Sequence, residues 1–422
     1  MAVNIARAVI PLILILLGNI VQRRWALYGS ILRVLGFLSL TMLVTGTDFF
    51  SDMLIVTSIA IGIAIAGYTL HYSYLKYGNP NLTVAVDMFL LIMVLVFTSE
   101  SLIEFIAFWL STELIGFFLI AYDYIAKDDR DSMSAAIKYL LFSMIPTDIA
   151  LFILLALTGF TEALSALRGS TLSITDPMVL TMILLGFFSK AAIFPLHFWL
   201  PDAHSVAPSP ASALLSGLMV KMGIYALYIL GFYQIDKGLA SSIMLFSGLL
   251  TAIYGAMQAI IQHDIKRILA YSTTSETALI TVVIALYMIS SDRLFIEAAI
   301  LYTVAHAVYK ASMFMDTGFV ELAAHERNVS RLGYIAWIAP TETTAVFISI
   351  LAILGMPPSI GFLAKLFTFA AISRYLSSSW IYIAVLLVAS IKVALSIIYN
   401  MIYLRAHLGL SLIHISEPTR PY

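Results

Sequence analysis

The sequence predicts an all-α, polytopic integral membrane protein, and three observations support this fold class. Of its 422 residues, 61% are hydrophobic and 11% are charged, whereas soluble domains carry about 25% charged residues. Apolar runs of about 20 residues, long enough for a membrane-spanning helix, alternate with short polar connections. Residues 151–157 and 381–389 are apolar on every side, which excludes the two-residue alternation of a β-barrel. A soluble enzyme with one aqueous cleft is also excluded.

Charge and cysteine content exclude further classes. The formal net charge is −1, from 23 Lys and Arg against 24 Asp and Glu, without a basic face that could release counterions from a nucleic acid. Since the chain has no cysteine, it can form no disulfide, no thiolate metal site and no cysteine-bound iron–sulfur cluster. We therefore expect no nucleic-acid partner and no cofactor. Any redox centre would belong to another chain.

The apolar runs predict thirteen spans in chain order. The first holds Arg7 as its only charge and continues into Arg23 and Arg24 without a small-residue cleavage pattern, so we expect a membrane helix and not a signal peptide. The thirteen predicted spans are residues 3–20, 31–48, 53–74, 82–99, 102–122, 136–158, 178–200, 210–232, 241–261, 268–289, 295–320, 335–372 and 381–404.

Lysine and arginine in the short loops predict the orientation, because cytoplasmic loops carry an excess of both. Loops after the odd-numbered spans hold Arg23, Arg24, Lys76, Lys127, Arg130, Lys266, Arg267, Arg327 and Arg331. Loops after the even-numbered spans hold mainly Arg168, Lys237, Arg293 and Arg374. This bias predicts an N-terminus outside the cell and residues 123–131 inside.

The last residues, 410–422, are set apart from the predicted fold. The stretch Leu-Ser-Leu-Ile-His-Ile-Ser-Glu-Pro-Thr-Arg from Leu410 resembles the translation of a transposase adapter used to prepare sequencing libraries. An ordinary polar tail is the alternative. On the adapter interpretation these residues are not native, and the natural protein continues beyond Gly409.

Many ionisable residues lie inside the predicted spans. A Lys, Asp or Glu at the centre of a span costs about 2.5–3.5 kcal/mol on insertion scales, so such residues face protein or water and commonly mark an ion path. Apolar turns flank Glu113, Lys190, Lys221 and Lys365 on both sides. Further along the chain, the spans also hold Glu276, His306, Lys310, Asp316 and Lys392.

The alternative to an ion path is an interhelical pair or a side chain that snorkels to the headgroups. For Asp148, Asp316 and Lys392 both interpretations stay open. For the four residues with apolar turns on both sides, the sequence favours function. A buried lysine can carry a proton, and we expect Glu113 to be its movable partner.

Proline interrupts two of the predicted spans. Pro195 follows Lys190 by five residues, and Pro357 and Pro358 precede Lys365. Proline inside a helix frees a carbonyl and kinks the axis, which membrane proteins tolerate where the break lines a cavity. Each broken span carries a lysine, and the next span carries another. Interrupted helices at corresponding positions of two halves are typical of inverted-repeat transporters with sites near the midplane.

Histidines supply a further proton carrier. His306 and Lys310 are four residues apart and so share a helix face; His306 could pass protons or be hydrogen-bonded in a helix interface. His197, His204 and His263 lie at span ends, where a solvated or loop-capping role is as plausible as function. Without cysteine or a helical pair of histidines, no metal site is expected.

Five stretches carry a resemblance to a known family. They are residues 135–143, 190–217, 264–272, 306–311 and 355–365, and the longest begins Lys-Ala-Ala-Ile-Phe-Pro-Leu-His-Phe-Trp-Leu-Pro-Asp-Ala-His at Lys190. Together they resemble the antiporter-like, proton-translocating subunits of respiratory complex I (NADH:quinone oxidoreductase), of Mrp-type cation/proton antiporters and of membrane-bound hydrogenases. The resemblance covers most of residues 50–405.

The resemblance implies a fold of about fourteen helices with a hydrated axis of charged residues at mid-membrane. It implies N-terminal helices in residues 1–49 and an antiporter-like domain in residues 50–409, with two inverted five-helix repeats at about 82–232 and 241–404. In the matching motifs Glu113 is the family's glutamate, Lys190 its broken-helix lysine and Lys221 a connecting lysine. His306 and Lys310 are the linking pair, and Lys365 is the terminal residue of the second half.

The resemblance also implies a function. We expect proton, or cation and proton, translocation by a non-catalytic subunit of a complex I-like or membrane-bound hydrogenase-like respiratory complex. The alternative is a subunit of an Mrp-type Na⁺/H⁺ antiporter without redox activity. A freestanding solute transporter is disfavoured by the lysine-rich axis. Glu276 and Asp316 depart from the family pattern, which adds them, with Lys392, as candidates for an additional cation path.

The expected surroundings follow from the same resemblance. The partners would be other membrane subunits, including antiporter-like paralogues and a redox module, together with the lipid bilayer. The translocated ions would be protons or Na⁺. The expected location is the plasma membrane of a prokaryotic cell, as a multi-pass protein.

Overall fold

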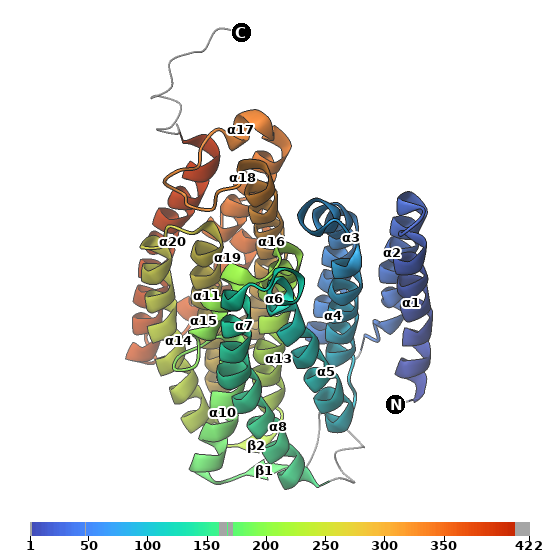
Figure 1. The fold of residues 1–422 in the computed structure, drawn as a ribbon. Coiled ribbons are helices and arrows are strands. Elements are labelled where there is room, and N and C mark those ends of the chain that lie inside the picture. The colour runs from blue at the N-terminus through green and yellow to red at the C-terminus, as the bar shows by residue number, and fades with distance from the viewer. Residues whose placement is uncertain (1, 47, 160–166, 168–171, 410–422) are drawn as a thin grey trace.

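The computed structural model describes residues 2–46, 48–159, 167 and 172–409. The segment resembling an adapter, residues 410–422, lies outside the described residues. The described chain is a bundle of packed helices (Figure 1). Its first half contains α1 (Ala2–Val21), α2 (Ala26–Ser39), η1 (Leu40–Leu43), α3 (Phe49–Tyr77), α4 (Asn81–Phe97), α5 (Leu102–Ile120), α6 (Tyr122–Lys127), α7 (Arg130–Tyr139), the π-helical turn η2 (Leu140–Met144) and α8 (Ile145–Thr158).

The later helices follow the same up-and-down course. They are α10 (Pro177–Ala191), α11 (Trp199–Val206), α12 (Ser209–Leu214), the π-helical turn η3 (Leu215–Met219), α13 (Val220–Leu230), α14 (Lys237–Ile260), α15 (Ile265–Ser290), α16 (Arg293–Ala324), α17 (Ile335–Ile338), α18 (Pro340–Leu354), α19 (Ile360–Ser373) and α20 (Trp380–Leu408). Outside the helices, β1 (Ser173–Ile174) and β2 (Gln234–Ile235) form one short parallel pair. The all-α prediction omitted this pair, which joins two loops at one end of the bundle (Figure 1).

The chain is an integral membrane protein by the length and composition of its helices. Within the described residues, nine helical stretches are long and apolar enough to cross a membrane. They are Ala26–Leu43, Phe49–Tyr77, Leu102–Ile120, Arg130–Thr158, Ser209–Leu230, Lys237–Ile260, Ile265–Ser290, Arg293–Ala324 and Trp380–Leu408. Shorter apolar helices are Arg7–Val21, Asn81–Phe97, Pro177–Ala191, Pro340–Leu354 and Ile360–Ser373. The number of thirteen crossings therefore stays a prediction.

Polar side chains set where these apolar helices begin. Ser101 caps α5 through a reciprocal capping box with Glu104, whose carboxylate reaches back to the Ser101 N–H. Asp264 and Asp292 accept hydrogen bonds from the first free N–H groups of α15 and α16. Such caps satisfy backbone donors that the helix cannot pair internally. In a chain so uniformly apolar, they define the helix starts more sharply than hydrophobicity does.

Two helices are broken beside proline. The predicted span 178–200 is not continuous, because α10 ends at Ala191 and Ala192 adopts a left-handed backbone with φ of 57°. The Phe194–Pro195 peptide bond is cis, and the chain becomes helical again at Trp199. In the second half, α18 ends at Leu354 and α19 begins at Ile360, with a cis Pro357–Pro358 bond between them. The proline rings supply no N–H to continue either helix.

A buried ion pair attaches the N-terminal helices to the bundle. Arg33 of α2 and Asp87 of α4 are fully buried and bidentate, with Nε–Oδ2 at 2.6 Å and NH2–Oδ1 at 2.8 Å. The remaining guanidinium nitrogen, NH1, donates to Gln22 Oε1 at 3.1 Å and to the Ala66 carbonyl at 2.7 Å. Asn19 donates to Asp87 Oδ2 at 2.7 Å. This network joins α1, α2, α3 and α4 at the side of the bundle (Figure 1).

One end of the bundle carries a second set of charges. Lys76 Nζ lies 3.2 Å from Asp123 Oδ2 and 3.3 Å from Glu321 Oε1, which joins the ends of α3, α6 and α16. Arg327 pairs with Asp264 at the start of α15. We call this end the Asp123 face. It brings together basic residues from loops that the charge bias assigned to the cytoplasm, whereas the orientation in a membrane stays a prediction.

Candidate functional site

Glu113 and Lys190 form an ion pair inside the N-terminal half. Glu113 lies within α5 and Lys190 in the last turn of α10, and both side chains are fully buried. Glu113 Oε1 lies 2.5 Å from Lys190 Nζ. Trp109, one turn before Glu113, donates its indole N–H to the same oxygen at 3.0 Å. Glu113 Oε2 has no hydrogen-bond partner among the described residues.

Aromatic rings and a second carboxylate surround this pair. Lys190 Nζ donates to Tyr139 OH at 3.2 Å, and it lies 5.1 Å from the Tyr139 ring centroid and 5.7 Å from that of Trp109. Asp148 of α8 lies within electrostatic range of both Glu113 and Lys190. Two carboxyl groups therefore lie near one ammonium group; Glu113 and Lys190 are fully buried, and Asp148 is partly buried. Their charges balance when one carboxyl holds a proton, so this cluster can store a proton.

The break after α10 fixes the position of Lys190. The last carbonyls of a helix lack intrahelical partners, and here the Trp199 indole N–H, beyond the break, donates to Ser189 O at 2.8 Å. Ser189 Oγ in turn donates to Ser143 O in the π turn η2, at 3.2 Å. The end of α10 is thus hydrogen-bonded to Trp199 on one side and to η2 on the other. These contacts hold Lys190 against α5 and not toward lipid.

A lysine–histidine contact lies at the centre of the molecule. Lys221, in the first turn of α13 after η3, donates to Ser216 O at 2.6 Å and contacts His306 Nδ1 of α16. The π turn widens the helix there and presents the Ser216 carbonyl to Lys221, five residues later. Lys310, one turn after His306, donates to Ser272 Oγ and to Leu269 O on α15. His306 Nε2 has no hydrogen-bond partner among the described residues.

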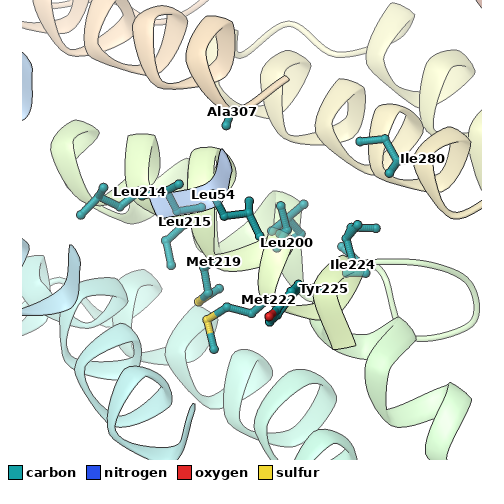
Figure 2. Close-up of a cluster of buried hydrophobic side chains, with 14 of the residues drawn as sticks. Leu54, Leu200, Leu214, Leu215, Met219, Met222, Ile224, Tyr225, Ile280 and Ala307 are labelled. Atoms are coloured by element: carbon teal, nitrogen blue, oxygen red, sulfur yellow. The ribbon is translucent and has the colours of Figure 1, made fainter. Parts of the chain in front are cut away.

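Apolar side chains separate the first cluster from the centre. Figure 2 shows buried residues of the helix from Ser209 to Leu230, among them Met219 and Met222, packed beside Leu54 and Leu200. Met219 Sδ lies 3.5 Å from Tyr139 OH, the hydroxyl that contacts Lys190. Among the described residues no ion pair or hydrogen bond joins Lys190 to Lys221. A proton passing between them would need water or side-chain movement in this apolar layer.

The C-terminal half contains a second glutamate–lysine pair. Glu276 of α15 and Lys392 of α20 are fully buried and form an ion pair through Glu276 Oε1. Tyr399 OH donates to the same oxygen at 3.2 Å, and Tyr302 OH donates to Oε2. Lys365, beyond the break before α19, instead donates to Ile353 O at 2.5 Å. The two halves therefore differ, because Glu113 pairs with the broken-helix lysine and Glu276 with the lysine of the following helix.

The second pair is electrostatically continuous with the centre. His306 lies within electrostatic range of Lys221, Lys310 and Lys392. Lys310 and Lys365 lie within range of Glu276. The structure thus brings six of the predicted residues into one cluster and keeps Glu113 and Lys190 in another. That central cluster is Lys221, Glu276, His306, Lys310, Lys365 and Lys392.

Asp316 lies apart from both clusters. It is near the end of α16, where its Oδ2 accepts from Tyr403 OH at 2.6 Å and lies 3.1 Å from His407 Nε2. Tyr403 and His407 both belong to the last turns of α20. The pairing with His407 was not foreseen, since His407 stands close to the end of the predicted span. Spacing along α20 offered a signal, because Tyr403 and His407 are one helical turn apart.

The histidines at the span ends occupy three different environments. His204 is fully buried and stacks on Phe314 at 4.6 Å between ring centroids. His197 is nearly buried beside Tyr254, with ring centroids 4.9 Å apart. The solvated role that the sequence left open is therefore wrong for both residues, because residues 197 and 204 are both buried in the bundle. His263 is exposed.

Several contributing residues escaped the sequence interpretation. Tyr139, Tyr302 and Tyr399 hold the lysines and glutamates through their hydroxyl groups. Aromatic residues are so common in membrane helices that only the fold distinguishes these three. Within residues 2–46, 48–159, 167 and 172–409, no group of three or more His, Asp or Glu side chains is arranged to hold a metal ion. The arrangement can store and transfer protons.

These features define a class of protein. The chain is an integral membrane protein of packed helices whose interior holds two glutamate–lysine pairs and a lysine–histidine centre. It belongs to the NADH:quinone oxidoreductase/Mrp antiporter transmembrane family, whose sequence model matches residues 99–395.

Named relatives include both a protein named for an antiporter and a protein named for an oxidoreductase subunit. The chain is 33% identical over 317 residues to a protein of Rhizobium meliloti (strain 1021) that is named for a K(+)/H(+) antiporter, covering 74% of this chain and 31% of that protein. It is 32% identical over 289 residues to "NADH-quinone oxidoreductase subunit N" of Desulforudis audaxviator (strain MP104C), covering 65% and 56%. The chain thus spans between about a third and somewhat over half of these two proteins.

The fold is also found in a solved membrane complex. A chain in the structure of the Mrp complex from Dietzia sp. DQ12-45-1b matches with a TM-score of 0.83 at 22% identity. The match covers 99% of this chain and 48% of that chain. At 22% sequence identity, this match shows similarity of the fold alone.

Proposed function

We propose that this chain translocates protons, or cations and protons, as a membrane subunit of a multisubunit complex. The observation that carries the proposal is the buried Glu113–Lys190 pair, with 2.5 Å between its charged atoms and no solvent exposure of either side chain. A buried ion pair gives little net stability, because desolvation offsets the attraction. A lysine can release its proton, whereas the arginine of the buried Arg33–Asp87 pair cannot, so the Glu113–Lys190 pair is the one suited to ion movement.

The proposed path runs from Glu113 and Lys190 through Lys221, His306 and Lys310. A proton arriving at the carboxyl cluster of Glu113 and Asp148 neutralises the partner of Lys190. The released lysine can then give its own proton toward the centre, where Lys221 contacts His306. His306 can accept at one nitrogen and release from the other. Lys310, Glu276, Lys392 and Lys365 would continue the path in the second half.

The coupling we propose first is to a redox reaction in a partner subunit of a complex I-like or hydrogenase-like assembly. Similarity to a protein named NADH-quinone oxidoreductase subunit N supports it. The second candidate is a cation/proton exchanger without redox chemistry, supported by similarity to a protein named for a K(+)/H(+) antiporter. Co-purified partners distinguish the two. Iron–sulfur subunits support redox coupling, whereas small membrane subunits alone support exchange.

The finer architecture belongs to the same proposal. We propose thirteen crossings, N-terminal helices in residues 1–49 and a translocating domain in residues 50–409. The repeats would be residues 82–232 and 241–404, in which α5 corresponds to α15 and the broken α10–α11 to the broken α18–α19. The proposed location is a prokaryotic plasma membrane, where antiporter-like paralogues would be neighbours.

The test uses the complex purified from its native membrane and placed in vesicles. We expect Glu113→Ala and Lys190→Ala to abolish proton translocation, measured with a pH-sensitive dye, and to leave subunit composition unchanged. Lys138→Ala is the matched control, because Lys138 is half-exposed and pairs with Asp202 at the surface. Near-normal translocation by both pair variants would rule out the proposed path.

A further inference from the structure

One face of α20 carries an unbroken row of buried polar side chains. In order along the helix they are Lys392, Ser396, Tyr399, Asn400, Tyr403 and His407. At 100° per residue these positions fall within about 100° of helix circumference. Each is at most 1% exposed, whereas Ile391, Ile397 and Met401 on the other side are 46–53% exposed. Buried polar groups need hydrogen-bond partners; Ser396 and Asn400 donate to carbonyls of α20 itself, and the tyrosines donate to acids on other helices.

The two ends of this row contact charged groups. At the first end, Lys392 pairs with Glu276, to which Tyr399 also donates. At the last end, His407 Nε2 lies 3.1 Å from Asp316 Oδ2, which also accepts from Tyr403. Ser396 and Asn400 lie between the two ends on the same face. The row thus connects one buried acid with another.

The far end of the row lies near the Asp123 face. Asp316 precedes Glu321 by five residues on α16, about 7.5 Å along the helix, and Glu321 pairs with Lys76 on that face. Tyr68 of α3 donates to Met315 O at 2.8 Å and lies within electrostatic range of Asp316 and Glu321. From Lys392 to His407 the helix rises about 22 Å, more than half of a bilayer core of about 30 Å.

We propose that the buried face of α20, together with Asp316, forms a second proton path between the Glu276–Lys392 pair and the Asp123 face. Protons would pass between Asp316 and His407 at one end and between Tyr399, Lys392 and Glu276 at the other. Ser396 and Asn400 would order water between the ends. Three elements contribute groups at the Asp316 end: Thr343 of α18, 3.4 Å from His407 Nδ1, Tyr68 of α3, and Tyr403 of α20.

This inference rests on the proposed function, but its first test does not need ion translocation. The chain has no cysteine, so single cysteines report local water access without background in this subunit. Ser396→Cys places a thiol in the row, and Ser390→Cys places one on an exposed face of the same helix. Both serines donate to a carbonyl of their own helix, so the substitutions are matched.

The assembled complex in vesicles is treated with methanethiosulfonate ethylammonium, and labelling of this chain is followed by mass. Thiols react as thiolates, which need water. We therefore expect Ser396→Cys to react on the order of tenfold faster than Ser390→Cys in the lipid-facing surface. Equal rates, or faster labelling of Ser390→Cys, would overturn the path.

The second test measures proton translocation by Asp316→Asn and Tyr403→Phe beside Lys190→Ala. We expect both variants of the row to lose most of the flux while the complex stays assembled. If Lys190→Ala abolishes flux and both row variants keep it, the second path is wrong and the proposed function stands. If Lys190→Ala and Glu113→Ala both keep near-normal flux, the proposed function itself fails.

Discussion

At the scale of single residues, the interior of this protein holds charges that a membrane disfavours. Lys190 is tolerated because one carboxylate, one hydroxyl and two aromatic faces replace its water. Lys365 is held more simply, by a backbone carbonyl at the break before α19. The two broken-helix lysines therefore differ in their partners: Lys190 pairs with a carboxylate, whereas Lys365 donates to a carbonyl.

Asp148 gives a prediction at this scale. The sequence left its role open, and the structure places it in electrostatic range of Glu113 and Lys190. We expect Asp148→Asn to slow proton translocation by about tenfold. This is less than the about 10²-fold or more that an indispensable acid or base contributes. The readout is the initial rate of vesicle acidification. A rate equal to that of the unmodified complex would show that Asp148 serves packing only.

At the scale of elements, the breaks in α10–α11 and α18–α19 position the lysines. Close packing of backbone at the second break depends on glycine. A Cβ built on Gly361 would lie 1.9 Å from the Ala352 carbonyl oxygen, so α19 can approach α18 only without a side chain there. Gly355, just after α18, adopts φ of +73°. Together these glycines let the chain reverse and present Lys365 to Ile353 O.

Gly361→Ala therefore should destabilise the second half. We expect a loss of about 1–3 kcal/mol, the range of an overpacked site, seen as a lower midpoint of thermal unfolding of the purified complex. Gly67→Ala in α3 is the matched control, because a Cβ there meets nothing within 4 Å. The control should leave the midpoint unchanged or raise it slightly. An unchanged midpoint for Gly361→Ala would contradict the packing described at this break.

Much of the element order could be predicted from the sequence, because apolar runs and proline positions act locally. The exact end of α10 at Ala191 could not, since the apolar run continues to residue 200 and Pro195, which predicts the break, lies four residues after Ala191. The partner of Glu276 was also beyond reach. Lys365 and Lys392 are both candidates from the sequence, and the fold gives the contact to Lys392. Choices between partners depend on three-dimensional packing, which local patterns do not encode.

At the scale of the whole molecule, charge networks outside the proposed path hold the helices together. The Arg33–Asp87 network joins four N-terminal helices, and the Lys76–Asp123–Glu321 contacts join the two halves at the Asp123 face. Neither network was singled out in the sequence, because an arginine in a predicted span is not by itself distinguishable from one near a headgroup. Both networks couple regions that lie far apart in the chain.

The Arg33–Asp87 pair gives a prediction at this scale. Removing one partner leaves a buried charge, so Arg33→Leu or Asp87→Leu should cost about 3–5 kcal/mol, whereas the double substitution should cost much less. The measurement is a double-substitution cycle on thermal unfolding of the purified complex. The exposed Arg331–Glu326 pair, at 3.5 Å, is the control and should contribute about 0–1 kcal/mol. Additive losses at the buried pair would contradict the network.

The central claim is that the charges of Glu113 and Lys190, and not their packing, carry the ion. The most direct measurement is proton translocation by the complex with the neutral double substitution Glu113→Gln and Lys190→Met, which keeps the shapes of both side chains. A neutral pair of similar volume should leave the complex assembled and at least as stable. We predict no proton flux above that of vesicles without driving force. Flux at the unmodified rate would contradict the claim.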